Sequence, residues 1–286
     1  MTQSQNTPEQ QPNRVGRRQL LVAGGATVSL GALLAACGGN GAGEPGRVGF
    51  SPAPTALPTE TIDDAVYLRT AQSIENTIVD VYGRITEAGA LTGGAAELLA
   101  RLVDEHTATA DEVADLVTEA GGEPYDCTNS WYMERVIPPL FERIEGDLEQ
   151  DIAPSDDPAR DALALIDAME SMAASMYQRF VGMLSTPQVR SEVMRFAARS
   201  ASHSAAVAIV ATGAPEAYVS PLVIGEELTP DESGLVPLFA VPGQFGTLNP
   251  YSLVLGAASS AGTRATFSLE TPADNSFVYH GQTCDT

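Results

Sequence analysis

Four side chains that can bind a metal ion or exchange a proton interrupt apolar stripes in four helix-length segments. Two are carboxylates and two are imidazoles: Glu75, His106, Glu170 and His203. Each lies where steps of three and four residues predict a buried helix face. Buried ionisable groups are costly unless they are paired, hydrogen-bonded or bound to a metal. We therefore expect the four side chains to meet in one polar layer of a core.

The apolar residues around these four positions recur with the spacing of one helix face. Ala71, Ile78, Tyr82 and Ile85 accompany Glu75, and Leu163, Ile166, Ala173, Tyr177 and Phe180 accompany Glu170. His106 lies in the stripe of Leu99, Val103, Ala110, Val113 and Val117, and His203 in that of Val193, Phe196, Ser200, Val207 and Val210. Four such stripes predict a mainly α fold, a four-helix bundle with a buried polar layer.

The order Glu, His, Glu, His indicates an internal repeat. Tyr82 follows Glu75 by seven positions, and Tyr177 follows Glu170 by the same interval. The pattern predicts a doubled helical hairpin. The tyrosines could support ligands or be redox-active, but core residues with satisfied hydroxyls are the simpler interpretation.

These residues resemble the ferritin-like superfamily, over roughly residues 61–213. That family holds two metals with one Glu from each of two helices and a Glu-x-x-His from each of the other two. The resemblance aligns Glu75 and Glu170 with the single glutamates, and His106 and His203 with the motif histidines. It implies an up-down bundle with a long middle connection.

The sequence departs from the family pattern at both Glu-x-x-His motifs, where Val103 and Ser200 replace the glutamates. Two carboxylates and two imidazoles remain, a set that suits one Fe, Mn or Zn ion. Direct Glu–His pairing without metal is the alternative. A third possibility is that the groups do not meet. We expect Asp167, Asp104 and Glu105 to be solvated charges off the stripes.

Two function classes follow. One is a metal-binding protein, with metal-dependent oxidoreductase-type chemistry if it is an enzyme at all; the other is a non-enzymatic envelope scaffold or interaction protein. The sequence has no Gly-x-Ser-x-Gly, Cys-x-x-Cys or phosphate-loop motif. A net charge of −22 and the absence of Lys argue against nucleic-acid binding and lysine chemistry.

The N-terminus predicts export. Arg17 and Arg18 precede an apolar run over 20–36, which resembles a twin-arginine signal, and the residues before Cys37 resemble a bacterial lipobox. We expect residues 1–36 to be a signal peptide, Cys37 to be lipidated and 37–60 to be a linker. The protein would then be anchored by lipid to the outer face of the cytoplasmic membrane. A simple transmembrane anchor is the alternative.

Cys127 and Cys284 are the other two cysteines, and an oxidising compartment favours their pairing as a disulfide over two free thiols. The sequence does not identify a protein partner and leaves a dimer open.

Helices are expected over about 61–88, 95–120, 155–184 and 188–213, with Thr59 or Thr61 capping the first. The connection over 123–154 predicts a short cross-over helix at one end of the bundle, interrupted by Pro138 and Pro139. Residues 214–286 read as a β-rich extension, with strands near 252–256 and 263–270 and a last one near Phe277. His280 is expected at the surface or in a structural role.

Overall fold

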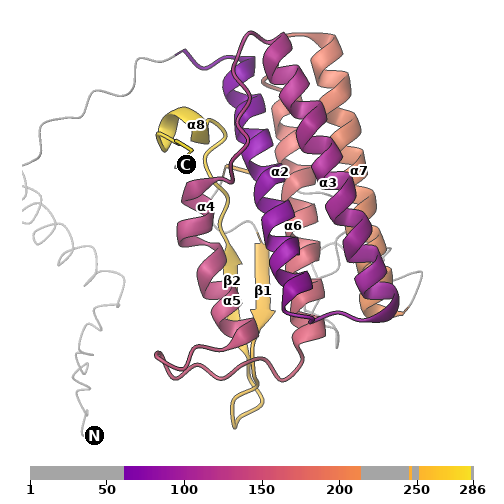
Figure 1. Cartoon of the computed structure of the whole chain (residues 1–286), viewed down its shortest axis with the longest axis vertical. Helices are drawn as coiled ribbons and strands as arrows, with labels where there is room; N and C mark the ends of the chain where they lie inside the picture. The colour runs from indigo at the N-terminus through magenta and orange to yellow at the C-terminus, as the bar shows by residue number, and fades with distance from the viewer. Residues whose placement is uncertain (1–60, 214–244, 247–250, 285–286) are drawn as a thin grey trace, which may run out of the picture. The chain divides into compact units, whose positions relative to one another are not determined.

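The computed structural model describes residues 61–213, 245–246 and 251–284, and these residues are mainly helical. They belong to one compact unit, Pro58–Thr286. Its four long helices are α2 (Asp64–Glu87), α3 (Gly93–Glu119), α6 (Pro158–Val181) and α7 (Pro187–Thr212). Figure 1 shows these four helices, which we call the helical body, lying side by side. The expected signal peptide, Cys37 and linker lie outside the described residues.

Side-chain caps fix where three of the long helices begin. Asp63, Asp157 and Thr186 accept hydrogen bonds from backbone N–H groups in the first turns of α2, α6 and α7. The expected capping of the first helix by Thr59 or Thr61 is therefore wrong, because the Asp63 carboxylate holds the Val66 N–H. Helix α3 begins at Gly93, two residues earlier than expected, where glycine tolerates a φ of +56°.

The helical body consists of two hairpins, α2 with α3 and α6 with α7, which contact each other through α2–α6 and α3–α7. Its core is apolar and aromatic. The largest fully buried side chains include Tyr82, Tyr177 and Phe180. The predicted stripes face this core with one clear exception, Val210, which is 40% exposed near the end of α7. The helical prediction is thus confirmed for the described residues.

The middle connection contains two short helices, α4 (Ser130–Arg135) and α5 (Ile137–Glu145). The segment is interrupted near Pro138 and Pro139, as expected: α4 ends just before them, and they lie in the first turn of α5, where a missing N–H costs nothing. The apolar face of α5 is buried. Both helices run along the side of the helical body in Figure 1, and not over one end as expected.

The described part of the tail contains two strands, β1 (Tyr251–Leu255) and β2 (Ala265–Leu269), paired antiparallel with Leu253 opposite Phe267. Strand β1 packs against α6. The expected last strand near Phe277 is wrong, because Ser276–Tyr279 forms the helical turn α8, which contacts α2. The buried Ser276 hydroxyl accepts a hydrogen bond from Asn129, and this contact holds the turn against the body.

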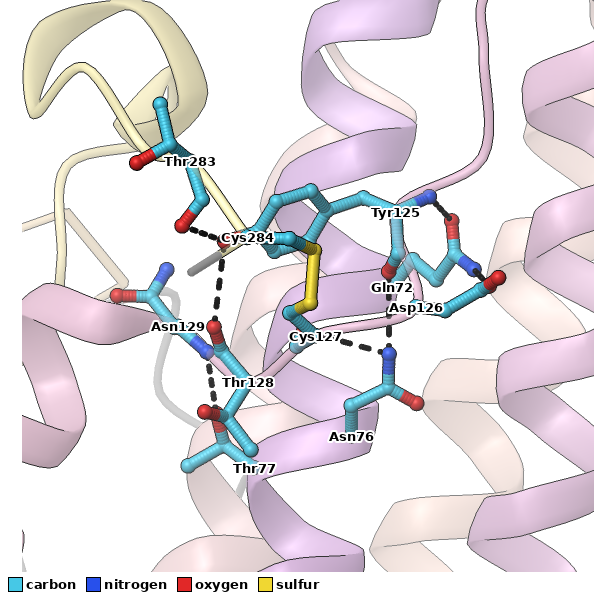
Figure 2. Close-up of a disulfide and its surroundings, with 10 residues drawn as sticks. All are labelled: Gln72, Asn76, Thr77, Tyr125, Asp126, Cys127, Thr128, Asn129, Thr283 and Cys284. Carbon is cyan, nitrogen blue, oxygen red and sulfur yellow. Dashed lines mark hydrogen bonds between the residues drawn. A yellow bond between two sulfur atoms is a disulfide. The ribbon is translucent and has the colours of Figure 1, made fainter. Parts of the chain in front are cut away.

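A disulfide joins Cys127, in the loop after α3, to Cys284 at the end of the tail, as the sequence predicts. Figure 2 shows the side chains that hold the loop against α2. Asn76 donates to the carbonyl of Cys127, and Gln72 accepts from the backbone N–H of Tyr125. The tail is therefore fixed covalently to a loop that α2 already holds.

None of the helices in the described part of the chain combines the length and apolar character that crossing a membrane requires.

Candidate metal centre

The four residues predicted from the stripes meet at one level of the helical body. His106 lies between the two carboxylates: its Nδ1 is 2.6 Å from Glu75 Oε2, and its Nε2 is 2.9 Å from Glu170 Oε1. His203 Nδ1 lies 3.3 Å from Glu170 Oε2. Each helix of the body thus supplies one residue to the site.

Three of these residues form a group that could hold a metal ion. Donor atoms of His106, Glu170 and His203 all lie within 4.8 Å of one another. Glu75 is not in this group, because it contacts the opposite nitrogen of the His106 ring. Three of the four expected ligands therefore face one another, while Glu75 lies on the other side of the His106 ring.

The two repeat tyrosines complete the site. Tyr82 donates a hydrogen bond of 2.9 Å to Glu170 Oε1, and Tyr177 donates one of 2.6 Å to Glu75 Oε1. Both rings are fully buried. Burial raises the pKa of each tyrosine well above 10, and the adjacent carboxylate raises it further. Both hydroxyls therefore stay protonated and act as donors, so the tyrosines are core residues with satisfied hydroxyls, as the simpler interpretation holds.

The electrostatics of the site favour a charged His106. Burial alone would lower the pKa of this imidazole, but the carboxylates of Glu170 and Glu75 outweigh it and raise that pKa to about 10. Burial would raise the pKa of Glu170, but His106 and His203 lower it to about 2. Without metal, the site thus holds an imidazolium between two carboxylates, which satisfies both ring N–H groups.

Access to solvent differs among the four residues. The side chains of Glu75 and Glu170 are 0% exposed and that of His106 is 2% exposed, whereas His203 is 14% exposed. His203 is therefore the member of the group nearest to solvent.

Asp167 corrects another expectation. It is buried and not solvated, and it accepts a hydrogen bond of 2.6 Å from Ser204, the neighbour of His203. Burial raises the pKa of Asp167 to about 7, although the Ser204 hydrogen bond opposes this shift. Asp104 on α3, by contrast, is exposed, and the neighbouring Glu105 is half-buried.

A chain of polar contacts lies one turn from the site, across the α3–α7 seam. Arg199 donates to Thr109 Oγ1 at 2.6 Å and to Glu112 Oε1 at 3.2 Å, and its Nε is 3.9 Å from Glu105 Oε2. Arg195 also pairs with Glu112, at 2.6 Å. The sequence does not single out Arg199, Arg195, Thr109 or Glu112, and it places Glu105 among solvated charges, because surface Arg–Glu pairs have no pattern that distinguishes them from such charges.

Two other features lie apart from the metal group. His280 is half-buried, stacks on Trp131 with ring centroids 5.0 Å apart and contacts Ser276 through Nδ1, which fits its expected structural role. An open groove of about 620 Å³ lies between the start of α2, the end of α3 and the start of α7. None of the four site residues lines this groove.

Comparison of the chain with protein-family models, with functionally characterised proteins and with solved structures finds no match. The functional argument therefore depends on the geometry and chemistry of the site.

Proposed function

We propose that this chain is a membrane-anchored, extracytoplasmic metal-binding protein whose helical body is a ferritin-like up-down four-helix bundle. One divalent transition-metal ion, Fe, Mn or Zn, binds to His106, Glu170 and His203. The observation that carries this proposal is the convergence of two imidazoles and one carboxylate, with all donor atoms within 4.8 Å. The loss of both motif glutamates, to Val103 and Ser200, leaves ligands for one ion and not for two.

The donor set fits such an ion. Imidazole suits Zn, Fe, Cu and Ni, and two histidines with one carboxylate are the protein ligands of known zinc and non-haem iron sites with an open position. Metal–ligand bonds of about 2.0–2.2 Å require only small movements of side chains that already lie this close. A bound ion would supply Lewis-acid or redox chemistry at that open position.

The remaining residues orient the ligands. Glu75 accepts the Nδ1–H of His106, which fixes the ring so that Nε2 faces Glu170 and His203. Tyr177 in turn holds Glu75, and Tyr82 holds Glu170. Carboxylates behind a ligating histidine set its tautomer and raise its basicity. This arrangement gives the buried Glu75 a function without making it a ligand.

The export signals support the proposed location. Arg17, Arg18 and Cys37 lie outside the described residues, so their role is inferred from the sequence alone. The Cys127–Cys284 disulfide is consistent with an oxidising compartment, where such bonds persist.

The test is elemental analysis of the full chain purified in detergent, together with four variants. We expect near-stoichiometric Fe, Mn or Zn in the parent, and none in Glu170→Gln or His203→Ala. His280→Ala is the matched control, because this third histidine belongs to the tail and should leave metal content unchanged. Glu75→Gln should retain metal with affinity weakened by about 10- to 100-fold, the effect of losing a group that orients a ligand.

Two results would contradict the metal site, and a third would change its ligand set. A parent without bound metal, even after anaerobic incubation with Fe²⁺, Mn²⁺ and Zn²⁺ in turn, would exclude the metal site. Metal retained in both Glu170→Gln and His203→Ala would place the ion elsewhere. Complete loss of metal in Glu75→Gln, with unchanged stability, would restore Glu75 as a direct ligand.

A second candidate function is a metal-free envelope scaffold or interaction protein. The observation in its favour is that both ring nitrogens of His106 already have carboxylate partners, at 2.6 and 2.9 Å. Nitrogen NMR of the isolated full chain distinguishes the two. The scaffold requires both His106 nitrogens to be protonated in the protein as purified, whereas a bound metal ion requires an unprotonated Nε2.

A further inference from the structure

We propose that a divalent cation reaches the buried group through the α3–α7 seam, and that Arg199 closes this route. The inference rests on the proposed function, since it concerns how the same site is loaded and emptied. The observations that carry it are the unequal exposure of the ligands and the contacts of Arg199 beside them.

His203 marks the route. Its side chain is 14% exposed, while the other two potential ligands are at most 2% exposed. His203 is on α7 and contacts Glu170 on α6, while His106 lies across the seam on α3. An ion that arrives from solvent therefore meets His203 first and the buried carboxylate afterwards.

Other approaches are filled by side chains. Between α6 and α7, Asp167, Ser171 and Ser204 are buried and hydrogen-bonded through the Ser204 hydroxyl. Between α2 and α6, the Tyr82 ring lies against the site and is fully buried. On the seam itself, Val207 is fully buried on one side of His203. On the other side of His203, one helical turn away, polar contacts join α7 to α3.

Arg199 makes these polar contacts from α7 to α3. It donates to the buried Thr109, pairs with Glu112 and approaches Glu105, which is adjacent in sequence to His106. Its side chain is 22% exposed. Hydrogen bonds and ion pairs at such partly exposed positions are individually weak, so their rupture is far easier than separation of an apolar helix interface.

The charges match a cation route. When Arg199 is in place, its guanidinium neutralises Glu105 and Glu112 and repels a cation. When it swings away, Glu105 loses this cation while Glu112 keeps Arg195, so the seam next to His106 gains negative charge that raises the local concentration of cations. Arg199 would therefore act by both steric closure and charge, without contacting the ion.

The experiment measures Co²⁺ loading of the metal-free full chain by stopped-flow absorbance, and Co²⁺ release by competition with EDTA. Arg199→Met keeps the aliphatic packing but removes the polar contacts, and Thr109→Val removes the buried acceptor at constant size. Arg195→Met is the matched control, because Arg195 pairs with Glu112 but has no contact with Thr109. A neutral reagent, diethyl pyrocarbonate, reports steric access to His203 by peptide mass spectrometry without any metal.

We expect both Arg199→Met and Thr109→Val to raise the loading and release rates together by about five- to tenfold, because the loss of a few weak contacts lowers the barrier by that much. The Kd for Co²⁺ should change by less than about twofold. Acylation of His203 should accelerate similarly, and Arg195→Met should change neither. Unchanged loading and acylation in both variants would overturn the route, as would a changed Kd with an unchanged loading rate. Failure of the parent to bind Co²⁺ would count against the metal site, while the acylation rates would still decide the role of Arg199.

Discussion

The Tyr177 hydroxyl donates to Glu75 at 2.6 Å, although these residues lie in different hairpins of the helical body. The reciprocal bond joins Tyr82, in the first hairpin, to Glu170 in the second. Each hairpin therefore supplies the donor that the buried carboxylate of the other requires. In each glutamate, Oε2 is partnered by the histidine of its own hairpin and Oε1 by the tyrosine of the other, so the polar layer couples the packing of the two halves.

The first prediction concerns these two hydrogen bonds between the hairpins. Tyr177→Phe leaves Glu75 Oε1 without its donor in a site that solvent does not reach, so the variant should lose about 1–3 kcal/mol of unfolding free energy. Urea denaturation of the metal-free protein measures this loss. Tyr279→Phe is the control, because Tyr279 is 64% exposed, and its effect should stay below about 0.5 kcal/mol. Equal effects of the two substitutions would show that the Tyr177 bond adds nothing.

The second prediction concerns alkaline pH. The pKa of His106 is raised from 6.5 to about 10 in the folded protein, by carboxylates that outweigh its burial. Its contribution to stability is complete below pH 6.5 and is lost as pH rises toward 10. Metal-free protein should lose about 1.4 kcal/mol per pH unit between pH 7 and 9. Urea denaturation in EDTA gives this slope, and His106→Gln should abolish it.

Acid produces the opposite slope through Glu170, whose folded pKa is lowered to about 2 because His106 and His203 outweigh its burial. Its contribution to stability is complete above its ordinary pKa of 4.5 and is lost as pH falls toward 2.

The alkaline prediction has its own contrary outcome. A slope between pH 7 and 9 that persists in His106→Gln would assign the loss of unfolding free energy to other groups.

The third prediction separates Asp167 from the metal group. Burial raises its pKa from 3.8 to about 7, so ionisation costs stability as pH rises through that interval. Asp167→Asn keeps an oxygen acceptor for Ser204 but cannot ionise. The variant should therefore be more stable than the parent at pH 7, by about 1–3 kcal/mol, and equal to it near pH 3.5. Asp104→Asn, on the exposed face of α3, should show no such difference in thermal or urea unfolding.

The fourth prediction concerns the disulfide. Reduction of Cys127–Cys284 removes the covalent link between the tail and the α3–α4 loop, and leaves α8 held by non-covalent contacts such as the Asn129–Ser276 hydrogen bond and the packing of Phe277 on Tyr125. The chain-entropy model gives about 4–5 kcal/mol for a loop of this length. Hydrogen exchange should accelerate first in 276–284 and leave the amides of α6 unchanged. Equal acceleration in α6 and α8 would show that the tail and body unfold together.

Much of the site could be predicted from the sequence because helix periodicity determines which residues face a core. Glu75, His106, Glu170 and His203 share a level since each lies near the middle of its stripe, and packed helices bring such positions together. The same periodicity does not determine side-chain rotamers. Spacing therefore cannot show whether Glu75 contacts the His106 nitrogen that faces Glu170 or the opposite one.

The expectation of a solvated Asp167 is wrong because α6 buries more than a single stripe of residues. Every residue from 161 to 177 is buried, since α7, α2, α5 and β1 all pack around this helix. A helix that is apolar on all sides is buried on all sides. The sequence contains this signal: between Asp161 and Arg179 the only charged residues are Asp167 and Glu170.

The tail was harder to predict because short segments take their conformation from tertiary contacts. The two strands were found, since alternation is a local signal. The turn α8 depends on Ser276 meeting Asn129, 147 positions earlier in the chain. Likewise, the placement of α4 and α5 along the body depends on where the apolar face of α5 finds partners, and sequence spacing does not contain that information.

The two histidines of the internal repeat are not equivalent. His106 contacts the glutamate of its own hairpin through Nδ1 and that of the other hairpin through Nε2. Among the described residues, His203 contacts the carboxylate of Glu170 alone and meets the His106 ring edge to face, with ring centroids 5.5 Å apart. One imidazole thus bridges the two halves of the site and the other is peripheral. In the proposed metal site, substitutions at position 106 would alter folding and ligand affinity together, while those at position 203 would change exchange of the ion with less effect on the fold.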